Sequence, residues 1–444
     1  MVKRKLTHLQ IIALGFFIII AAGTLLLMLP AASNAHTSTP FMTALFTATS
    51  ASCVTGLVLV DTAAHWSLFG QLVILVMIQL GGLGFMTVAT LFFSFAKKNI
   101  GLRRRAIMAE SINSSHIAGL KKITRRIVTG TVIFEAAGAV LLSLRFVGEF
   151  GAAKGIYYGI FHSVSAFCNA GFDLMGIRES YSSFVRYSND TLVNITLMLL
   201  ITIGGIGFLV WDDIAQNKLK FRRYQLHTKL VLITSAVLVF GGAAVIWLFE
   251  RNGLMAEMSA KEQLLTSLFS SVTCRTAGFN TVDLAGLSKA GMLFMSFLMY
   301  VGGSSGSTAG GIKTTTLAVA CIHIFSSLRG IRQPRIFRRT FEDGTMKKAF
   351  TVMLVNFTLS FAGAILILAV QELPVADVIF ETSSAMGTVG MSTGITRELL
   401  PFSQAVIIFL MYCGRVGSTS FALALLEKRE NPPVTYPVEN ITIG

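Results

Sequence analysis

Four short motifs along this chain, each centred on one glycine, have the residue types needed to coordinate a dehydrated monovalent cation. The motifs are Val54-Thr55-Gly56, Asn169-Ala170-Gly171, Thr276-Ala277-Gly278 and Thr388-Val389-Gly390. Their glycines are 115, 107 and 112 residues apart. A potassium ion that loses its hydration shell needs a cage of oxygens, which rings of backbone carbonyls can supply. Four such loops in one chain predict a four-walled, potassium-selective ion filter that requires no tetramer.

The glycine of each motif has a stereochemical role in this interpretation. Consecutive carbonyls point the same way only when the backbone alternates between conformations, and glycine adopts the left-handed ones without strain. The preceding residue is small in each motif, so the four strands can approach one axis. The fourth motif also matches the start of the potassium-channel filter sequence. The alternative is that the four glycines only pack helices in an unrelated bundle.

Long and short apolar segments alternate around these motifs and predict the elements that position them. Each unit has a long apolar segment, a short one, the glycine loop and a second long segment. A segment of roughly 20 apolar residues can span a bilayer, and the short segments cannot. The long segments are 9–30, 69–96, 125–147, 190–211, 228–250, 287–327, 349–370 and 401–425. The short segments, predicted as re-entrant half-helices, are 39–53, 153–168, 261–275 and 374–387.

We therefore predict an all-α integral membrane protein with eight transmembrane helices and four re-entrant half-helices around a pseudo-fourfold central pore. The predicted organisation is repeat 1 over 1–96, repeat 2 over 97–211, repeat 3 over 212–327, repeat 4 over 328–426, and a cytoplasmic tail over 427–444. Two full spans per repeat return the chain to its starting side. All four repeats therefore have the same orientation.

Composition and charge support a membrane location. Hydrophobic residues make up 53% of the chain and charged residues 13%, which is unusual for a soluble protein. The net charge of +15 is concentrated in the tails and the longer basic loops. The positive-inside rule places these segments and both termini in the cytoplasm, so the basic charge indicates topology and not nucleic-acid binding. The five cysteines have no metal-like spacing, and no transition-metal site is expected.

The third repeat differs from the others because a glycine- and serine-rich stretch interrupts its second long segment. The residues are Gly302, Gly303, Ser304, Ser305, Gly306, Gly310 and Gly311, followed by Lys313. Non-helical backbone at membrane depth is tolerated only inside protein or along a water-filled cavity. Lys313 and Arg415 are the two cations predicted within the membrane, where such residues are costly and usually functional. We predict that the loop 302–314 and Arg415 form a gate or coupling element.

Weaker glycine clusters occur in the other second spans. They read Gly81-Gly82-Leu83-Gly84, Gly204-Gly205-Ile206-Gly207 and Gly414-Arg415-Val416-Gly417. They are either echoes of the interrupted span or close helix packing by small residues. The sequence leaves both interpretations open.

Acidic residues follow two of the motifs. Asp61 and Asp173 are predicted to draw cations to the outer mouth of the pore. Arg275 is a positive charge inside the third motif region, and we expect it to turn away and pair with an acid such as Glu381.

These motifs resemble the superfamily of potassium transporters that includes the bacterial Trk and Ktr systems and the plant HKT proteins. The resemblance covers nearly the whole chain, and the short length with only four repeats is most similar to the Ktr membrane subunits. It implies that the four motif glycines form the selectivity filter, that 302–314 is the intramembrane gating loop, and that Arg415 is the arginine of the last span. Serine at the first filter position marks sodium-preferring plant relatives, so Gly56 implies potassium selectivity.

The resemblance also implies partners. It predicts a homodimer with one pore per subunit in the bacterial cell membrane, and a cytoplasmic ring of nucleotide-binding RCK subunits that responds to ATP or ADP. This chain has no phosphate-binding glycine loop opening a helix after a strand, so nucleotide sensing must lie in the partner. The basic loops and the tail are the predicted contact surfaces. The family is linked to sodium-dependent activity, but no residue cluster here defines a sodium site.

Two other functions fit parts of the sequence. A sodium-coupled secondary potassium transporter would need the same filter and gate as a channel-like protein. An intramembrane serine protease is a distant alternative, because Gly303-Ser304-Ser305-Gly306 matches the rhomboid nucleophile motif and His323 follows. Their spacing predicts that Ser304 and His323 lie too far apart for a hydrogen bond. That alternative also leaves the fourfold motif unexplained.

Overall fold

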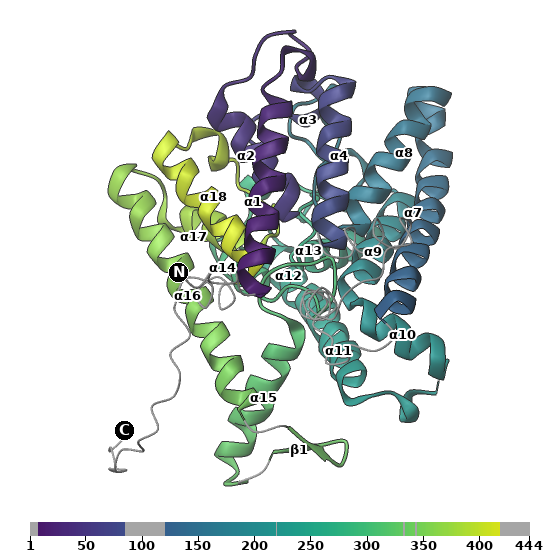
Figure 1. The fold of residues 1–444 in the computed structure, drawn as a ribbon, viewed down its shortest axis with the longest axis vertical. Coiled ribbons are helices and arrows are strands. Elements are labelled where there is room, and N and C mark those ends of the chain that lie inside the picture. Colours follow the sequence, from purple (N-terminus) through teal and green to yellow (C-terminus); the bar gives the residue numbers. More distant parts are fainter. Residues whose placement is uncertain (1–7, 85–119, 219, 332–333, 342–343, 418–444) are drawn as a thin grey trace, which may run out of the picture.

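The computed structural model is a tall bundle of helices (Figure 1). It describes residues 8–84, 120–218, 220–331, 334–341 and 344–417. The predicted tail 427–444, most of the basic stretch 97–124, and the last parts of the predicted long segments 69–96 and 401–425 lie outside these residues. Only one strand pair is present among the described residues, a two-residue hairpin of β1 (Arg335–Ile336) and β2 (Arg339–Thr340). It lies at the opposite end of the bundle from α3 (Thr62–His65) (Figure 1). The predicted all-helical membrane fold is confirmed.

Four helices within the described residues are long and apolar enough to cross a membrane. They are α1 (His8–Leu27), α7 (Leu120–Phe150), the run of α11 (Leu226–Ala236), the π-helical η5 (Val237–Gly241) and α12 (Gly242–Glu250), and α16 (Thr345–Val370). Each coincides with the first long segment of a predicted repeat. Large apolar side chains are exposed along all four, such as Phe17, Leu144, Phe240 and Leu354. Exposed apolar faces of this extent are typical of lipid contact.

The second long segments are shorter and interrupted. Helices α4 (Leu68–Leu83), α9 (Thr191–Ile206) and α18 (Pro401–Val416) each end at a left-handed glycine, namely Gly84, Gly207 and Gly417. The prediction of a continuous span over 190–211 is wrong, because α10 (Phe208–Asn217) follows α9 at an angle of 94°. In the third repeat, α14 (Lys289–Tyr300) and α15 (Thr314–Leu328) flank the non-helical stretch.

Both interpretations of the weaker glycine clusters are correct. The last glycine of each cluster ends its helix, and the first packs closely. A Cβ atom built on Gly81 would lie 2.1 Å from the Ser52 carbonyl oxygen, and one on Gly204 would lie 2.0 Å from the Phe167 carbonyl oxygen. Small residues therefore bring each second span against the end of the preceding short helix.

Four short helices lie where the half-helices are predicted. They are α2 (Phe41–Cys53), α8 (Ala152–Phe167), α13 (Ala260–Thr273) and α17 (Val375–Gly387). Pro40 and Pro374 precede the first and the last of these helices, where the missing N–H is tolerated. The remaining elements are single turns in the connecting loops, η1 (Pro30–Ala32), η2 (Met175–Ile177), η3 (Val185–Tyr187), η4 (Phe221–Arg223), η6 (Leu284–Gly286) and η7 (Ile395–Glu398).

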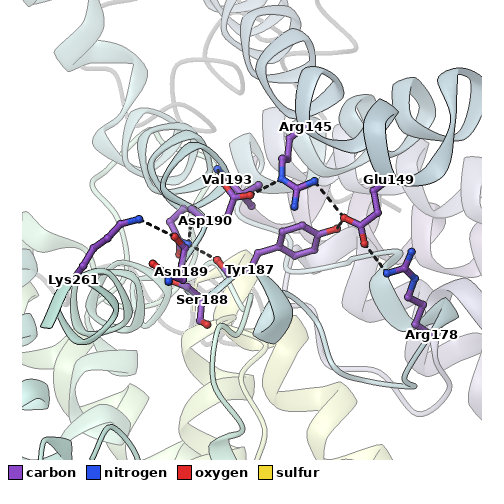
Figure 2. Close-up of polar contacts among 10 residues, drawn as sticks. Arg145, Glu149, Arg178, Tyr187, Ser188, Asn189, Asp190, Val193 and Lys261 are labelled. Atoms are coloured by element: carbon purple, nitrogen blue, oxygen red, sulfur yellow. Dashed lines mark hydrogen bonds and ion pairs between the residues drawn. The ribbon is translucent and has the colours of Figure 1, made fainter. Parts of the chain in front are cut away.

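An ion-pair network fixes the loop that follows the second motif (Figure 2). Arg145 Nε lies 2.6 Å from Asp190 Oδ2, and Arg178 Nη1 lies 2.8 Å from Glu149 Oε1. The Tyr187 hydroxyl donates to Glu149 Oε2 at 2.8 Å. The network ties the end of α7 to the middle and to the last residues of the loop between α8 and α9. These pairs are partly exposed, so each stabilises the fold by about 1 kcal/mol or less.

Candidate functional site

The four motif glycines form a closed ring. A Cβ atom built on Gly56 would lie 2.7 Å from the Ala170 carbonyl oxygen, and the equivalent atom on Gly171 would lie 2.7 Å from the Ala277 carbonyl oxygen. Gly278 faces the Val389 carbonyl oxygen at 2.5 Å in the same way, and Gly390 faces that of Thr55 at 2.1 Å. Each loop therefore touches the next one, and the fourth touches the first. Backbone atoms approach too closely in this ring for any side chain at the glycine.

The backbone of each motif turns left-handed twice. The glycines have φ values of 97°, 68°, 82° and 95° in chain order. The first residues of the motifs are also left-handed, with φ of 57° at Val54, 58° at Asn169, 72° at Thr276 and 52° at Thr388. The left-handed conformation is therefore not limited to the glycines. Left-handed β-branched residues are rare and strained, and such strain occurs mostly at functional sites.

Hydroxyl side chains near the end of each short helix form hydrogen bonds with the backbone of the ring. Ser50 and Ser384 accept the N–H of the motif glycine in their own repeat, each at 3.0 Å. Ser165 donates to the Phe172 carbonyl at 2.7 Å, and Thr273 donates to that of Phe279 at 2.8 Å. Sequence reasoning missed these residues. The available signal was a hydroxyl residue five or six positions before every motif glycine.

All four glycines line one cavity of about 320 Å³. Four carboxylates also line it, from Asp61, Asp173, Glu179 and Asp283, against one guanidinium, from Arg397. The cavity is therefore electronegative. The short helices end beside the ring with their partly negative C-termini, which adds to the attraction for a cation. Glu179, Asp283 and Arg397 were not predicted as site residues.

The two predicted outer-mouth acids both line this cavity but differ in their contacts. Asp61 caps α3, since its Oδ1 accepts the N–H groups of Ala63 and Ala64 at 2.9 Å. Its Oδ2 accepts the Tyr181 N–H at 2.8 Å, so backbone donors already occupy this carboxylate. Asp173 accepts the Met175 N–H at 3.0 Å. Burial raises the pKa of Asp173 to about 6.

The loop 302–314 lies directly beneath the ring. Thr308 Oγ1 donates to the Phe167 carbonyl at 3.2 Å, at the end of the second short helix. A Cβ atom on Gly310 would lie 2.1 Å from Thr388 Oγ1, the first residue of the fourth motif. The loop backbone also pairs with the break between α9 and α10, where the Phe208 N–H donates to the Gly306 carbonyl at 2.8 Å. Movement of this loop would therefore displace residues beside the second and fourth motifs of the ring.

The remaining predicted gate residues surround this contact. Gly302 accepts no side chain because its Cβ would lie 2.2 Å from the Gly310 carbonyl oxygen, and the Gly303 carbonyl accepts the Thr314 N–H at 3.0 Å. Gly311 is left-handed, with φ of 63°. Ser305 Oγ lies 3.4 Å from Thr315 Oγ1. The predicted gate residues are thus assembled in one place.

The two intramembrane cations are satisfied by carbonyl groups. Arg415 donates to the carbonyls of Thr308 and Gly81, and to that of Gly82 at 3.3 Å. It therefore joins the loop 302–314 to the end of α4. The Lys313 ammonium group folds back onto carbonyls of its own loop, at 2.8 and 3.3 Å. Among the described residues, neither side chain forms an ion pair with a carboxylate.

The predicted pairing of Arg275 with Glu381 is wrong. Arg275 donates through Nη2 to Ser235 Oγ at 3.1 Å, and Glu381 accepts a hydrogen bond from Thr396 Oγ1. Both side chains are buried. Arg275 lies just past the end of α13, whereas Glu381 lies inside α17.

The geometry does not support the protease alternative. Ser304 donates its hydroxyl to the Ile206 carbonyl. His323 lies on α15 with its ring against Phe350, at 5.7 Å between centroids. The nucleophile and base of a serine protease must share a hydrogen bond, and no such bond joins these two described residues.

Comparison with known proteins gives a consistent result. Residues 5–432 match the family model TrkH, described as a cation transport protein. The potassium/sodium uptake protein NtpJ of Enterococcus hirae is 42% identical over 451 residues, covering 100% of this chain and 98% of the relative. The Ktr system potassium uptake protein B of Bacillus subtilis is 36% identical over 442 residues, covering 99% and 97%.

A solved structure has the same fold. The potassium transporter TrkH from Vibrio parahaemolyticus superposes with a TM-score of 0.73, covering 96% of this chain and 86% of that chain. Its sequence identity is 16%, so the likeness concerns the fold alone.

Proposed function

The chain belongs to the TrkH family of cation transport proteins, and from this premise we propose that it carries potassium ions into the cell through the ring of four glycine loops. The observation that carries the proposal is the closed ring itself, in which every motif glycine faces the carbonyl of the next loop. Rings of backbone carbonyls replace the hydration shell of a potassium ion. The electronegative cavity on one side of the ring supplies cations to it.

The loop 302–314 is proposed to gate this path. It lies beneath three walls of the ring and is tied by Arg415 to the end of α4. A cation at this position opposes the passage of another cation, so displacement of the loop and Arg415 would open the pore. If replacing residues 303–311 with a short linker left flux and its regulation unchanged, the gate proposal would be abandoned.

The proposal includes partners. We propose a homodimer in the bacterial cell membrane with cytoplasmic termini and a cytoplasmic RCK-type ring that senses ATP or ADP. The relative in Bacillus subtilis is named as protein B of a Ktr system, which indicates that it works with other components. The structure describes this chain alone. Copurification of the full chain with such a ring, and nucleotide-dependent flux, would test this part.

The direct test is cation flux into liposomes that contain the purified chain. Rapid uptake of potassium and rubidium but not sodium, with selectivity lost in Gly56→Ser, is expected. Equal uptake of sodium, or no effect of the substitution, would mean that the selectivity element lies elsewhere. An uptake rate that depends on an opposing sodium gradient would favour the coupled transporter, whereas flux that follows the potassium gradient alone would favour a channel-like mechanism.

A further inference from the structure

One position of the four short helices holds a different type of side chain in each repeat. It lies nine residues before each motif glycine and is occupied by Thr47, His162, Phe269 and Glu381. All four side chains are buried, with exposed fractions of 1%, 0%, 1% and 0%. The second and fourth loops, which carry the two ionisable side chains, lie opposite each other in the ring.

His162 connects its short helix to the loop beyond the second motif. Its Nδ1 donates to the Tyr158 carbonyl at 2.7 Å, and its Nε2 accepts the Leu174 N–H at 3.0 Å. A carbonyl can only accept and an amide N–H can only donate, so these two bonds fix a neutral ring with the proton on Nδ1. The imidazole of His162 is enclosed by Phe146, Phe161 and Phe184. Both ring nitrogens of His162 therefore have a hydrogen-bond partner.

Glu381 makes the corresponding connection in the fourth loop. Thr396 Oγ1 donates to Glu381 Oε1 and lies 2.8 Å from Ser392 Oγ. Ser392 and Thr396 both line the cavity above the ring. The second carboxyl oxygen, Oε2, is buried without a hydrogen-bond partner among the described residues. Glu381 thus reaches the cavity wall through Thr396, whose hydroxyl group also contacts that of Ser392.

The other two positions make no such connection. The Thr47 hydroxyl has no partner among the described side chains, and Phe269 packs in the apolar core. Leaving one oxygen of a buried carboxyl group without a hydrogen bond destabilises the fold. A hydrophobic side chain fills the same position in the third loop, so packing alone does not require Glu381.

We propose that Glu381 is a positioning residue of the fourth loop. Through Thr396 it holds the return segment 391–396 over the ring and thereby sets how strongly the fourth wall discriminates potassium from sodium. Discrimination between potassium and sodium depends on the positions of the carbonyl oxygens, so the displacement of one loop changes the coordination of every ion that enters the ring. This inference rests on the proposed function.

The test compares pairs of substitutions in the full chain. Glu381→Leu removes the acceptor and Thr396→Val removes the donor, while Glu381→Gln and Thr396→Ser keep the hydrogen bond. Thr47→Val is the matched control, because it removes a hydroxyl without a partner at the same position of the first loop. Each variant is reconstituted in liposomes, and KM, Vmax and the ratio of potassium to sodium uptake are measured.

Glu381→Leu and Thr396→Val should each lower the uptake ratio about tenfold, and the double variant should lower it no further, as expected for two partners of one bond. The conservative variants and Thr47→Val should remain within about twofold of the parent protein. The concentrations of potassium and of sodium that protect the protein against heat give a second readout, since a ligand of the folded state stabilises it by an amount that grows with the ratio of ligand concentration to Kd. If Glu381→Leu folds poorly, Thr396→Val still tests the inference, because it removes the hydrogen bond and leaves the carboxyl group in place.

An unchanged ratio in Thr396→Val, or additive losses in the double variant, would overturn the inference. If the parent protein is selective and the variants have the same uptake ratio, the role of Glu381 is refuted and the proposed function is not. Parent protein that takes up sodium as well as potassium refutes the proposed function, and the inference falls with it.

Discussion

The ring of glycine loops and the layer directly beneath it follow different rules. In the ring, all four walls repeat one design, with two left-handed residues, the second of which is the glycine that lies against the next carbonyl. In the layer below, the quarters differ: α4 ends at Gly84, α9 continues at a 94° bend, the loop 302–314 replaces a helix, and α18 carries Arg415. The difference teaches that near-identical walls suit the coordination of an ion, whereas unequal ones suit its control.

The strongest way to break the comparison is to disturb one wall of the ring. A Cβ atom in Gly390→Ala would lie 2.1 Å from the Thr55 carbonyl oxygen, and the glycine φ of 95° disfavours alanine. We expect selective potassium uptake to fall about a hundredfold, equal to ~2.8 kcal/mol. The measurement is the potassium-to-sodium uptake ratio in liposomes. Gly148→Ala is the control, because a Cβ there meets nothing within 4 Å; equal behaviour of both variants would contradict the ring.

A smaller effect is expected in the layer below. Arg415→Gln removes the donors that join Thr308 to Gly81 and Gly82. Since these bonds hold the loop 302–314 beneath the ring, uptake without any regulatory partner should rise about fivefold, with the potassium-to-sodium ratio unchanged. Initial uptake rates in liposomes test this. Arg125→Gln, at an exposed position, should leave the rate as it is. A changed ion ratio in Arg415→Gln would mean that the two layers are not separate in function.

The cavity above the ring gives a pH-dependent test. Burial raises the pKa of Asp173 to about 6, so the carboxyl is charged at pH 7 and becomes neutral as the pH falls toward 5. Loss of this negative charge should raise the KM for potassium about threefold between pH 7 and pH 5. Asp173→Asn should show the higher KM at both values. A parent and a variant with the same pH profile would exclude Asp173 as the titrating group.

The smallest effect is expected in the outer ion-pair network. Arg178→Gln breaks the contact with Glu149, in which the arginine side chain is 47% exposed. Thermal unfolding should show a loss of about 0.5 kcal/mol, because partly exposed pairs contribute little. Uptake and selectivity should not change. A large loss of selectivity would show that the loop after the second motif is held mainly by this network.

The sequence predicts what depends on short-range pattern. Apolar run length locates α2, α8, α13 and α17 to within two residues, and glycine spacing locates the loops that meet in the ring. Both follow from local requirements, namely the length of a half-helix and the need for a residue without Cβ. The intramembrane loop was predictable for the same reason, since its glycine content excludes a helix.

Other features depend on tertiary contacts that no local pattern encodes. The left-handed turn at Val54 goes against the preference of a β-branched residue and is imposed by the end of α2 and the neighbouring loops. The bond from the Tyr181 N–H to Asp61 joins residues 120 positions apart and could not be predicted from a local pattern. Arg275 and Glu381 were paired by charge alone, and the fold gave each a hydroxyl partner of its own.

The four walls of the ring are written in four separate stretches of one chain. In a channel assembled from identical subunits, one altered codon changes every wall at once, so a wall cannot vary without its copies. Here a codon change alters a quarter of the ring and leaves the rest as inherited. Threonine, histidine, phenylalanine and glutamate could thus accumulate at one shared position of the short helices. The single chain lets natural variation adjust the walls one at a time.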